Sequence, residues 1–138
     1  MPVAITLFYA SLLAIVLLVM SWRVVALRRG LRVGLGSGGQ KSLELAIRAH
    51  ANFTEYVPLA LIIMLLLEGG TAVPGWLLHV LGTMLVVGRL MHGLFGLNRG
   101  EGKSIGRFWG TFLTWLMLLT SAALGLYHVI GGWLTAHA

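Results

Sequence analysis

Four polar residues recur at helical spacing in an otherwise apolar stretch of the chain. They are Glu44, Arg48, Asn52 and Glu55, and at 100° per residue they fall within an arc of about 80° on one helix face. Guanidinium and amide N–H groups donate hydrogen bonds to anions, whereas a carboxylate accepts them from an ammonium group. We call these four residues the polar stripe, and their types indicate ligand binding.

The composition places the polar stripe in a membrane protein. The chain has 138 residues, of which 58% are hydrophobic and 10% charged, whereas soluble domains carry about 25% charged residues. Four apolar segments are long enough to cross a bilayer. The sequence therefore predicts an all-α fold, a four-transmembrane-helix bundle forming a single domain over residues 1–138, with helices at about 4–28, 42–67, 74–97 and 106–131.

The basic residues predict the orientation of these helices. The net charge of +6 does not indicate nucleic acid, because the Lys and Arg side chains lie between apolar spans, where anionic lipid headgroups account for them. Predicted loops at 34–40 and 98–106, with their flanks, carry all ten Lys and Arg residues except Arg89, and the loop at 68–73 carries none. We therefore expect the first and third loops in the cytoplasm and both termini outside.

The second segment must carry charge into the membrane. Its uncharged core, between Glu55 and Glu68, is only 12 residues long, too short to span. Glu55 lies roughly 20 Å along a helix that starts near Ser42, close to the bilayer midplane. A charge that faces lipid there costs at least about 2.5 kcal/mol, so the polar stripe must face protein or a water-filled cavity.

The third and fourth segments offer partners for the polar stripe. Arg89 is expected at the depth of the Asn52–Glu55 turn, with His92 one turn away on the same side, and Arg107 opens the fourth segment. A structural Glu55–Arg89 ion pair is one interpretation. The other is a functional cavity, because the set exceeds what one ion pair needs, and arginines with one carboxylate suit a small anion that also carries an ammonium group.

Other side chains narrow the chemistry. No cysteine is present, so any thiol must come from a substrate or cofactor, and no histidine pair has metal-ligand spacing within a helix. We therefore expect no metal site. Small residues such as Gly106 and Gly110 favour close contact between helices.

The run RAHANFTEYVPLAL, preceded by LRRGLRVGLG and followed by GRLMHGLFG, resembles the MAPEG family, the membrane-associated proteins in eicosanoid and glutathione metabolism. The likeness is greatest to its small bacterial branch of inner-membrane proteins and covers nearly the whole chain. It implies a homotrimer with glutathione bound between adjacent subunits near the cytoplasmic face. It also implies a bacterial inner-membrane location with both termini periplasmic, and membrane lipids and a lipophilic small-molecule substrate as further partners.

The resemblance assigns roles to individual residues. Arg107 corresponds to the arginine that stabilises the glutathione thiolate, and a guanidinium near a thiol favours the thiolate on general grounds. It implies a glutathione transferase or peroxidase that acts on lipophilic electrophiles. The positions that it matches to glutathione binding are Arg28, Arg48, His50, Asn52, Glu55, Tyr56, Arg89 and His92.

One departure from the family keeps a second function open. The leukotriene- and prostaglandin-forming members carry a tyrosine one helical turn beyond the His92 position, where this chain has Gly96. The difference argues against eicosanoid substrates. The alternative is a non-enzymatic membrane scaffold, or a protein that binds a lipid headgroup or another small anion on the same fold.

Overall fold

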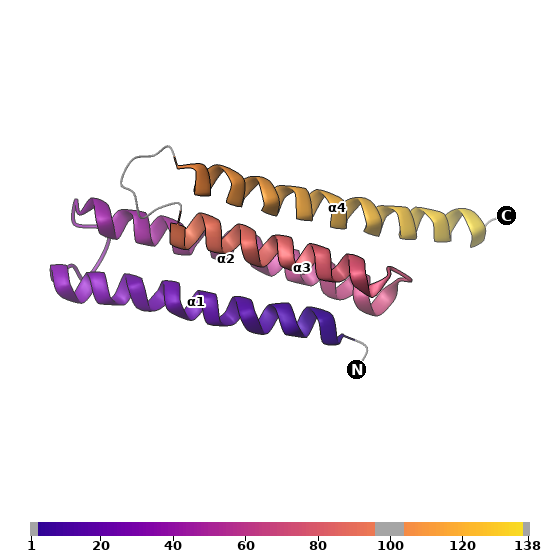
Figure 1. The fold of residues 1–138 in the computed structure, drawn as a ribbon, viewed down its shortest axis with the longest axis horizontal. Helices are drawn as coiled ribbons and strands as arrows, with labels where there is room; N and C mark the ends of the chain where they lie inside the picture. The colour runs from indigo at the N-terminus through magenta and orange to yellow at the C-terminus, as the bar shows by residue number, and fades with distance from the viewer. Residues whose placement is uncertain (1–2, 96–103, 137–138) are drawn as a thin grey trace.

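The structure, a computed structural model, describes residues 3–95 and 104–136. Four long helices follow one another along the chain (Figure 1), and a short π-helix, η1 (Met91–Phe95), continues the third. By length and hydropathy all four could cross a membrane, and the described residues contain no strand. The predicted all-α architecture with four helices long and apolar enough to span a membrane is confirmed: α1 (Ala4–Leu31), α2 (Lys41–Gly70), α3 (Gly75–Leu90) and α4 (Ile105–Ala136).

The four helices form a bundle with α2 and α3 at its centre. Helices α1 and α4 lie on opposite sides, and each packs against both central helices (Figure 1). The first residues of α1 and the last of α4 lie at the same end of the bundle, which we call the termini end. The α1–α2 loop marks the other end, which we call the loop end. Each end collects a different set of polar side chains.

Three helices extend beyond their expected bounds, among them α4, which was expected to end near residue 131 and continues to Ala136. Helix α1 continues to Leu31 and closes at Arg32, whose φ of 55° turns the chain so that its N–H bonds the carbonyls of Arg28 and Arg29. Helix α2 passes through Pro58 without ending and includes Glu68, where we expected a loop. The expected loop at 98–106 lies largely outside the described residues, but α4 already begins at Ile105.

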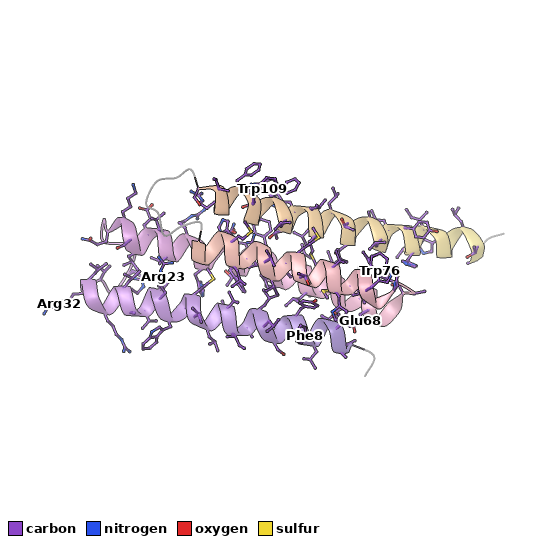
Figure 2. The ribbon with its side chains drawn as sticks, in the orientation of Figure 1. Phe8, Arg23, Arg32, Glu68, Trp76 and Trp109 are labelled. Atoms are coloured by element: carbon purple, nitrogen blue, oxygen red, sulfur yellow. The ribbon has the colours of Figure 1, made fainter. Side chains whose placement is uncertain are left out.

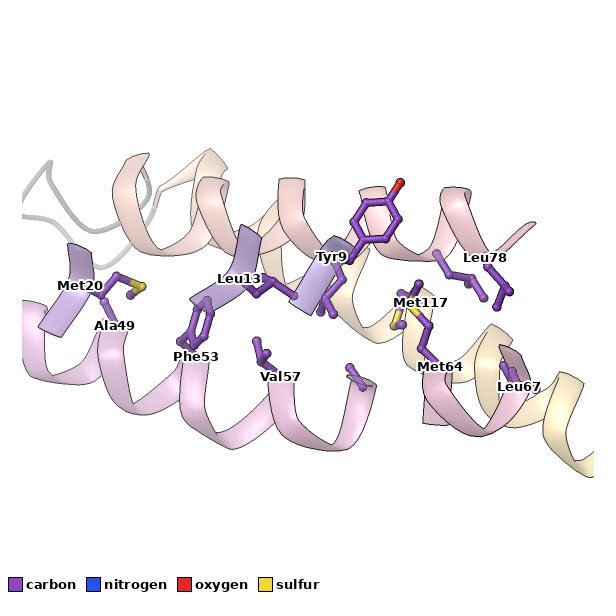
Figure 3. Close-up of a cluster of buried hydrophobic side chains, with 13 residues drawn as sticks. Tyr9, Leu13, Met20, Ala49, Phe53, Val57, Met64, Leu67, Leu78 and Met117 are labelled. Carbon is purple, nitrogen blue, oxygen red and sulfur yellow. The ribbon is translucent and has the colours of Figure 1, made fainter. Parts of the chain in front are cut away.

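The core is a single apolar cluster shared by all four helices. Figure 3 shows its side chains meeting between α2 and its neighbours, with Phe53 and Val57 of α2 near Leu13 of α1, and Met64 near Met117 of α4. Burial at every third or fourth position of α2 is the periodicity of a helix that packs along one face. The buried residues of α2 are Leu43, Ala46, Ala49, Phe53, Val57, Ala60, Met64 and Leu67.

Helix α4 packs against the bundle along a narrow face. Its buried residues are only Gly110, Thr114, Met117 and Ser121, whereas large apolar side chains such as Trp109 project away from the bundle (Figure 2). Phe8 and Trp76 project outward in the same way, while Arg23 and Arg32 lie towards the loop end. An apolar exterior with charge gathered near the ends is what a bilayer requires.

Candidate functional site

Arg89 lies at the centre of the candidate site and joins three helices. It projects from α3 and is 1% exposed. Its Nη1 donates to Oδ1 of Asn52 on α2 at 2.7 Å. On α4, its Nη2 donates to Oγ1 of Thr114 at 2.6 Å and to the carbonyl oxygen of Gly110 at 3.2 Å. One buried guanidinium therefore ties the polar stripe to α4.

The close approach of α3 and α4 depends on two glycines. A methyl group at Gly110 would lie 2.5 Å from the carbonyl oxygen of Gly88 and 2.7 Å from the backbone nitrogen of His92. Both distances are below van der Waals contact, so no larger residue fits without moving a backbone. The close helix contact expected at Gly110 is present, and it brings the Gly110 carbonyl within reach of Arg89.

The end of α3 departs from α-helical geometry immediately after this contact. Residues Met91–Phe95 form a π-helix, a wider turn that is rare and frequently found at functional sites. His92 belongs to this turn, is 8% exposed, and packs against Gly110. The π-helical turn thus sets the position of His92 relative to the start of α4.

The expected Glu55–Arg89 ion pair is not formed. Glu55 is exposed on α2, and among the described residues no carboxylate oxygen lies within 4.0 Å of the Arg89 guanidinium. Asn52, one turn earlier on α2, occupies that place. The depth of Arg89 was predicted correctly, but its partner was wrong, because Asn52 turns inward and Glu55 turns to the surface of the bundle.

The polar stripe lies partly on the surface. Arg48 and Glu55 are exposed, whereas Asn52 and Tyr56 are half-buried. The Tyr56 ring centre lies 5.5 Å from Cζ of Arg89, within the range of a cation–π contact. The structure therefore brings Asn52, Tyr56 and Arg89 together, with Arg48 and Glu55 on the adjoining face of α2.

Two of the predicted ligand-binding residues have other partners in this chain. Arg28 donates through Nη1 to the carbonyl oxygens of Gly36 at 2.9 Å and Gly34 at 3.3 Å, and so holds the loop that follows α1. His50 Nε2 lies 3.0 Å from Ser21 Oγ, between α1 and α2. Their predicted contacts with glutathione stay predictions.

A groove on α4 brings two further predicted residues together. It has a volume of about 730 Å³ and opens to the outside of the bundle. Aromatic side chains dominate it, with Phe108 and Phe112 stacked at 6.4 Å between ring centres. We call it the α4 groove, and it is lined by His92, Ser104, Ile105, Arg107, Phe108, Trp109, Thr111, Phe112 and Trp115.

Comparison with known proteins assigns the chain to a family. A sequence model of the MAPEG family matches residues 6–127. The chain belongs to the MAPEG family. It is also 38% identical over 121 residues to the inner membrane protein YecN of Escherichia coli strain K12, covering 88% of this chain and 89% of that protein. The protein of the same name from Escherichia coli O6:H1 matches to the same extent.

This MAPEG chain has a second polar cluster, at the termini end, which the sequence did not reveal. Both carboxylate oxygens of Glu68 accept backbone N–H bonds from the first turn of α1, from Ile5 at 2.8 Å and Thr6 at 2.7 Å. The Tyr9 hydroxyl lies 3.0 Å from the carbonyl oxygen of His79. One feature could have indicated this contact. Helix α1 begins without a capping side chain, so its free N–H groups need an acceptor from another segment.

The same cluster includes the side chain of His79. Its Nδ1 lies 3.1 Å from the Tyr9 hydroxyl, which also lies 3.0 Å from Thr83 Oγ1. The Tyr9 ring packs directly on Gly82, where a Cβ would overlap the ring. These contacts join α1 to α3 at the opposite end from Arg89, and they indicate a structural contact rather than part of the candidate site.

Proposed function

We propose that this protein binds glutathione and acts as a glutathione transferase or peroxidase on lipophilic electrophiles. The observation that carries the proposal is the α4 groove, in which Arg107 and His92 lie beside the aromatic side chains of α4. A cationic group beside apolar surface suits a reaction that joins a charged nucleophile to a lipophilic partner. Membership of the MAPEG family supports the same conclusion.

The polar stripe fits the charge pattern of glutathione. The tripeptide carries two carboxylates and one ammonium group. Arg48 and the amide of Asn52 offer hydrogen-bond donors to carboxylates, and the exposed carboxylate of Glu55 on the same helix offers an acceptor to an ammonium group. Tyr56, half-buried on the same helix, lies beside Arg89. The donors and acceptors of α2 therefore match the ligand without a metal ion.

Arg107 would stabilise the reactive form of the ligand. Glutathione would supply a thiol, which attacks an electrophilic carbon or reduces a hydroperoxide. An ordinary thiol has a pKa of about 8.5 and is mostly protonated at neutral pH, and a nearby cation favours the thiolate. Arginine stays protonated in proteins, so Arg107 would act as fixed positive charge and not as a base.

The assembly that we propose is a homotrimer. Arg48 and Glu55 are exposed in the single chain, yet they belong to a helix that crosses the membrane. A charge facing lipid at that depth costs at least about 2.5 kcal/mol, so another surface must cover them. A second copy of the chain would do so, and the site would then lie between subunits.

The proposed location is the bacterial inner membrane with both termini on the periplasmic side. The name of the Escherichia coli relative supports the location. The orientation follows from the basic residues near the α1–α2 loop, which are retained on the cytoplasmic side of most membrane proteins. The site residues near Arg107 would then face the cytoplasm, where glutathione is made.

The alternative is a membrane protein that binds an anion without catalysis. Gly96 favours it, because glycine supplies no hydroxyl where the leukotriene- and prostaglandin-forming members have a tyrosine. An anion-binding protein would hold a headgroup or another small anion on Arg48 and Asn52. It would not conjugate glutathione to an aryl halide.

The test is a glutathione titration of the purified protein in detergent, followed by the ultraviolet absorbance of the thiolate. We expect a saturable signal that is lost in Arg107→Ala while binding is retained. Arg29→Ala, which removes an exposed arginine at the end of α1, is the matched control and should titrate like the wild type. No binding at millimolar glutathione would reject the proposal, and binding without turnover of an aryl halide or hydroperoxide would favour the alternative.

A further inference from the structure

The side-chain amide of Asn52 can face Arg89 in only one way. A guanidinium has N–H donors and no acceptor, so the Asn52 atom that lies 2.7 Å from Nη1 must be the amide oxygen. The oxygen and nitrogen of an asparagine amide are assigned from their partners, and here the partner leaves no choice. The Nδ2 group of Asn52 is therefore directed away from Arg89.

The second terminal nitrogen of Arg89, Nη2, is also held in place by hydrogen bonds. The Thr114 hydroxyl accepts a bond from Nη2 at 2.6 Å and donates its own hydrogen to the Gly110 carbonyl at 2.9 Å. Because the guanidinium is planar and rigid, holding Nη2 against α4 also sets the direction of Nη1. Arg89 is 1% exposed and has no surface with which to meet a ligand in this chain.

The Nδ2 group of Asn52 is left without a hydrogen-bond partner within the described part of this chain. Asn52 itself is half-buried. Arg48 lies one turn before it and Glu55 one turn after it, both exposed on α2. The two N–H donors of Nδ2 are thus available to a ligand that binds on the polar stripe.

We propose that Arg89 is a positioning residue that acts through Asn52. It holds the amide oxygen inward and so presents the Asn52 N–H donors to the ligand. The ligand group at this point is then a hydrogen-bond acceptor, a carboxylate or a peptide carbonyl, and not an ammonium group. The identity of the ligand rests on the proposed function, but the orientation of the amide does not.

The energetics of Arg89 agree with this role. Its hydrogen-bond partners are an amide, a backbone carbonyl and a hydroxyl, all of them uncharged. A buried charge without a charged partner is costly, and in the described part of the chain Nε of Arg89 also has no hydrogen-bond partner. We therefore expect Arg89→Met to fold, which makes a direct test possible.

The first experiment needs no ligand. The chain has two asparagines, Asn52 and Asn98, so selective ¹⁵N-asparagine labelling gives two pairs of side-chain amide signals, one pair for each residue, assigned with Asn98→Ser. We expect Arg89→Met to shift the Asn52 signal, Thr114→Val to shift it less, and the surface control Arg29→Met to leave it in place. An Asn52 signal unchanged in Arg89→Met would overturn the positioning role, whether or not glutathione binds.

The second experiment is a double-mutant cycle on glutathione affinity. Asn52→Ala and Arg89→Met should each weaken binding about tenfold, the loss of one well-formed hydrogen bond to a charged group. In the Asn52→Ala background, Arg89→Met should have almost no further effect, because residues that act through one another are not additive. A further tenfold loss there would show direct contact of Arg89 with the ligand and would overturn the proposal.

A third variant tests the chemistry of the ligand group. Asn52→Asp keeps an acceptor for Arg89 but offers the ligand no N–H donor, so we expect it to lose affinity at least as strongly as Asn52→Ala. Wild-type affinity in Asn52→Asp would overturn the acceptor assignment. If the wild-type protein binds no glutathione, the proposed function fails, and the amide signals of Asn52 still decide the role of Arg89.

Discussion

An oxygen of the Glu68 carboxylate, two residues before the end of α2, lies 2.7 Å from the backbone nitrogen of Thr6 in the first turn of α1. Its other oxygen lies 2.8 Å from the nitrogen of Ile5. A carboxylate at a helix N-terminus satisfies free N–H groups and opposes the helix dipole. Here the carboxylate belongs to a different helix, so the capping interaction also joins α1 to α2.

We expect Glu68→Ala to destabilise the protein by about 1–2 kcal/mol, the range for losing a helix cap. Glu68→Gln, which keeps one acceptor oxygen, should lose less. Reversible unfolding in mixed micelles measures both, and amide hydrogen exchange should increase at Ile5 and Thr6. Glu44→Gln, an exposed carboxylate on the same helix, is the control. Equal unfolding of Glu68→Ala and wild type would show that the two bonds contribute nothing.

Two glycines of α4 should respond to alanine with opposite signs. Gly110→Ala places a methyl group against the Gly88 carbonyl and His92, and overpacking of this kind costs about 1–3 kcal/mol. Gly125 has no atom within 4 Å of the added methyl, so Gly125→Ala should stabilise the helix by about 0.5–1 kcal/mol. Thermal unfolding of the two variants compares them directly. The same sign for both would contradict the close contact at Gly110.

The Tyr9 hydroxyl should contribute more to the stability of the fold than the hydroxyl of an exposed tyrosine. It has contacts with His79 and Thr83, and removing one hydrogen-bonding group in Tyr9→Phe should cost about 1 kcal/mol. Tyr127 is exposed on α4, so Tyr127→Phe is a matched control that should unfold like the wild type. Because Tyr9 is remote from Arg89, neither variant should change glutathione affinity.

The α4 groove should set the affinity for the lipophilic substrate. Trp115 lines the groove, whereas Trp133 lies on the same helix outside it. Trp115→Ala should raise the KM for a lipophilic electrophile about tenfold, as expected for a large aromatic contact, and leave the glutathione affinity unchanged. Trp133→Ala should change neither constant. Steady-state kinetics with both substrates varied separate the two effects, and a higher KM in Trp133→Ala would place the substrate elsewhere.

The number of helices could be predicted from sequence because hydropathy and length decide it. The depth of Arg89 followed in the same way, from a rise of about 1.5 Å per residue. Its partner did not, because Asn52 and Glu55 differ by only about 60° around α2, which is less than the rotational freedom of a helix in a bundle. Whether Asn52 or Glu55 points towards Arg89 is therefore decided only by how the helices pack.

The remaining features depend on contacts between distant segments. No residue type in Met91–Phe95 predicts a π-helix. This π-helix follows directly after the close contact between Gly88 and Gly110. The end of α2 was predicted at residue 67 instead of Gly70 for a similar reason. Glu68 and the glycines after it are typical of a loop, but Glu68 is held by the backbone of α1, some sixty residues earlier in the chain. Sequence patterns describe local preference and do not include such partners.

The length of α4 has a consequence for the membrane around it. Its 32 residues rise about 48 Å, whereas the hydrocarbon layer of a bilayer is about 30 Å thick. A helix with this hydrophobic mismatch tilts or extends beyond the lipid, and the last turns of α4 extend past the other three helices and are exposed in the single chain (Figure 1). Bilayer thickness would therefore control the tilt of α4, and with it the angle at which its aromatic groove meets the acyl chains.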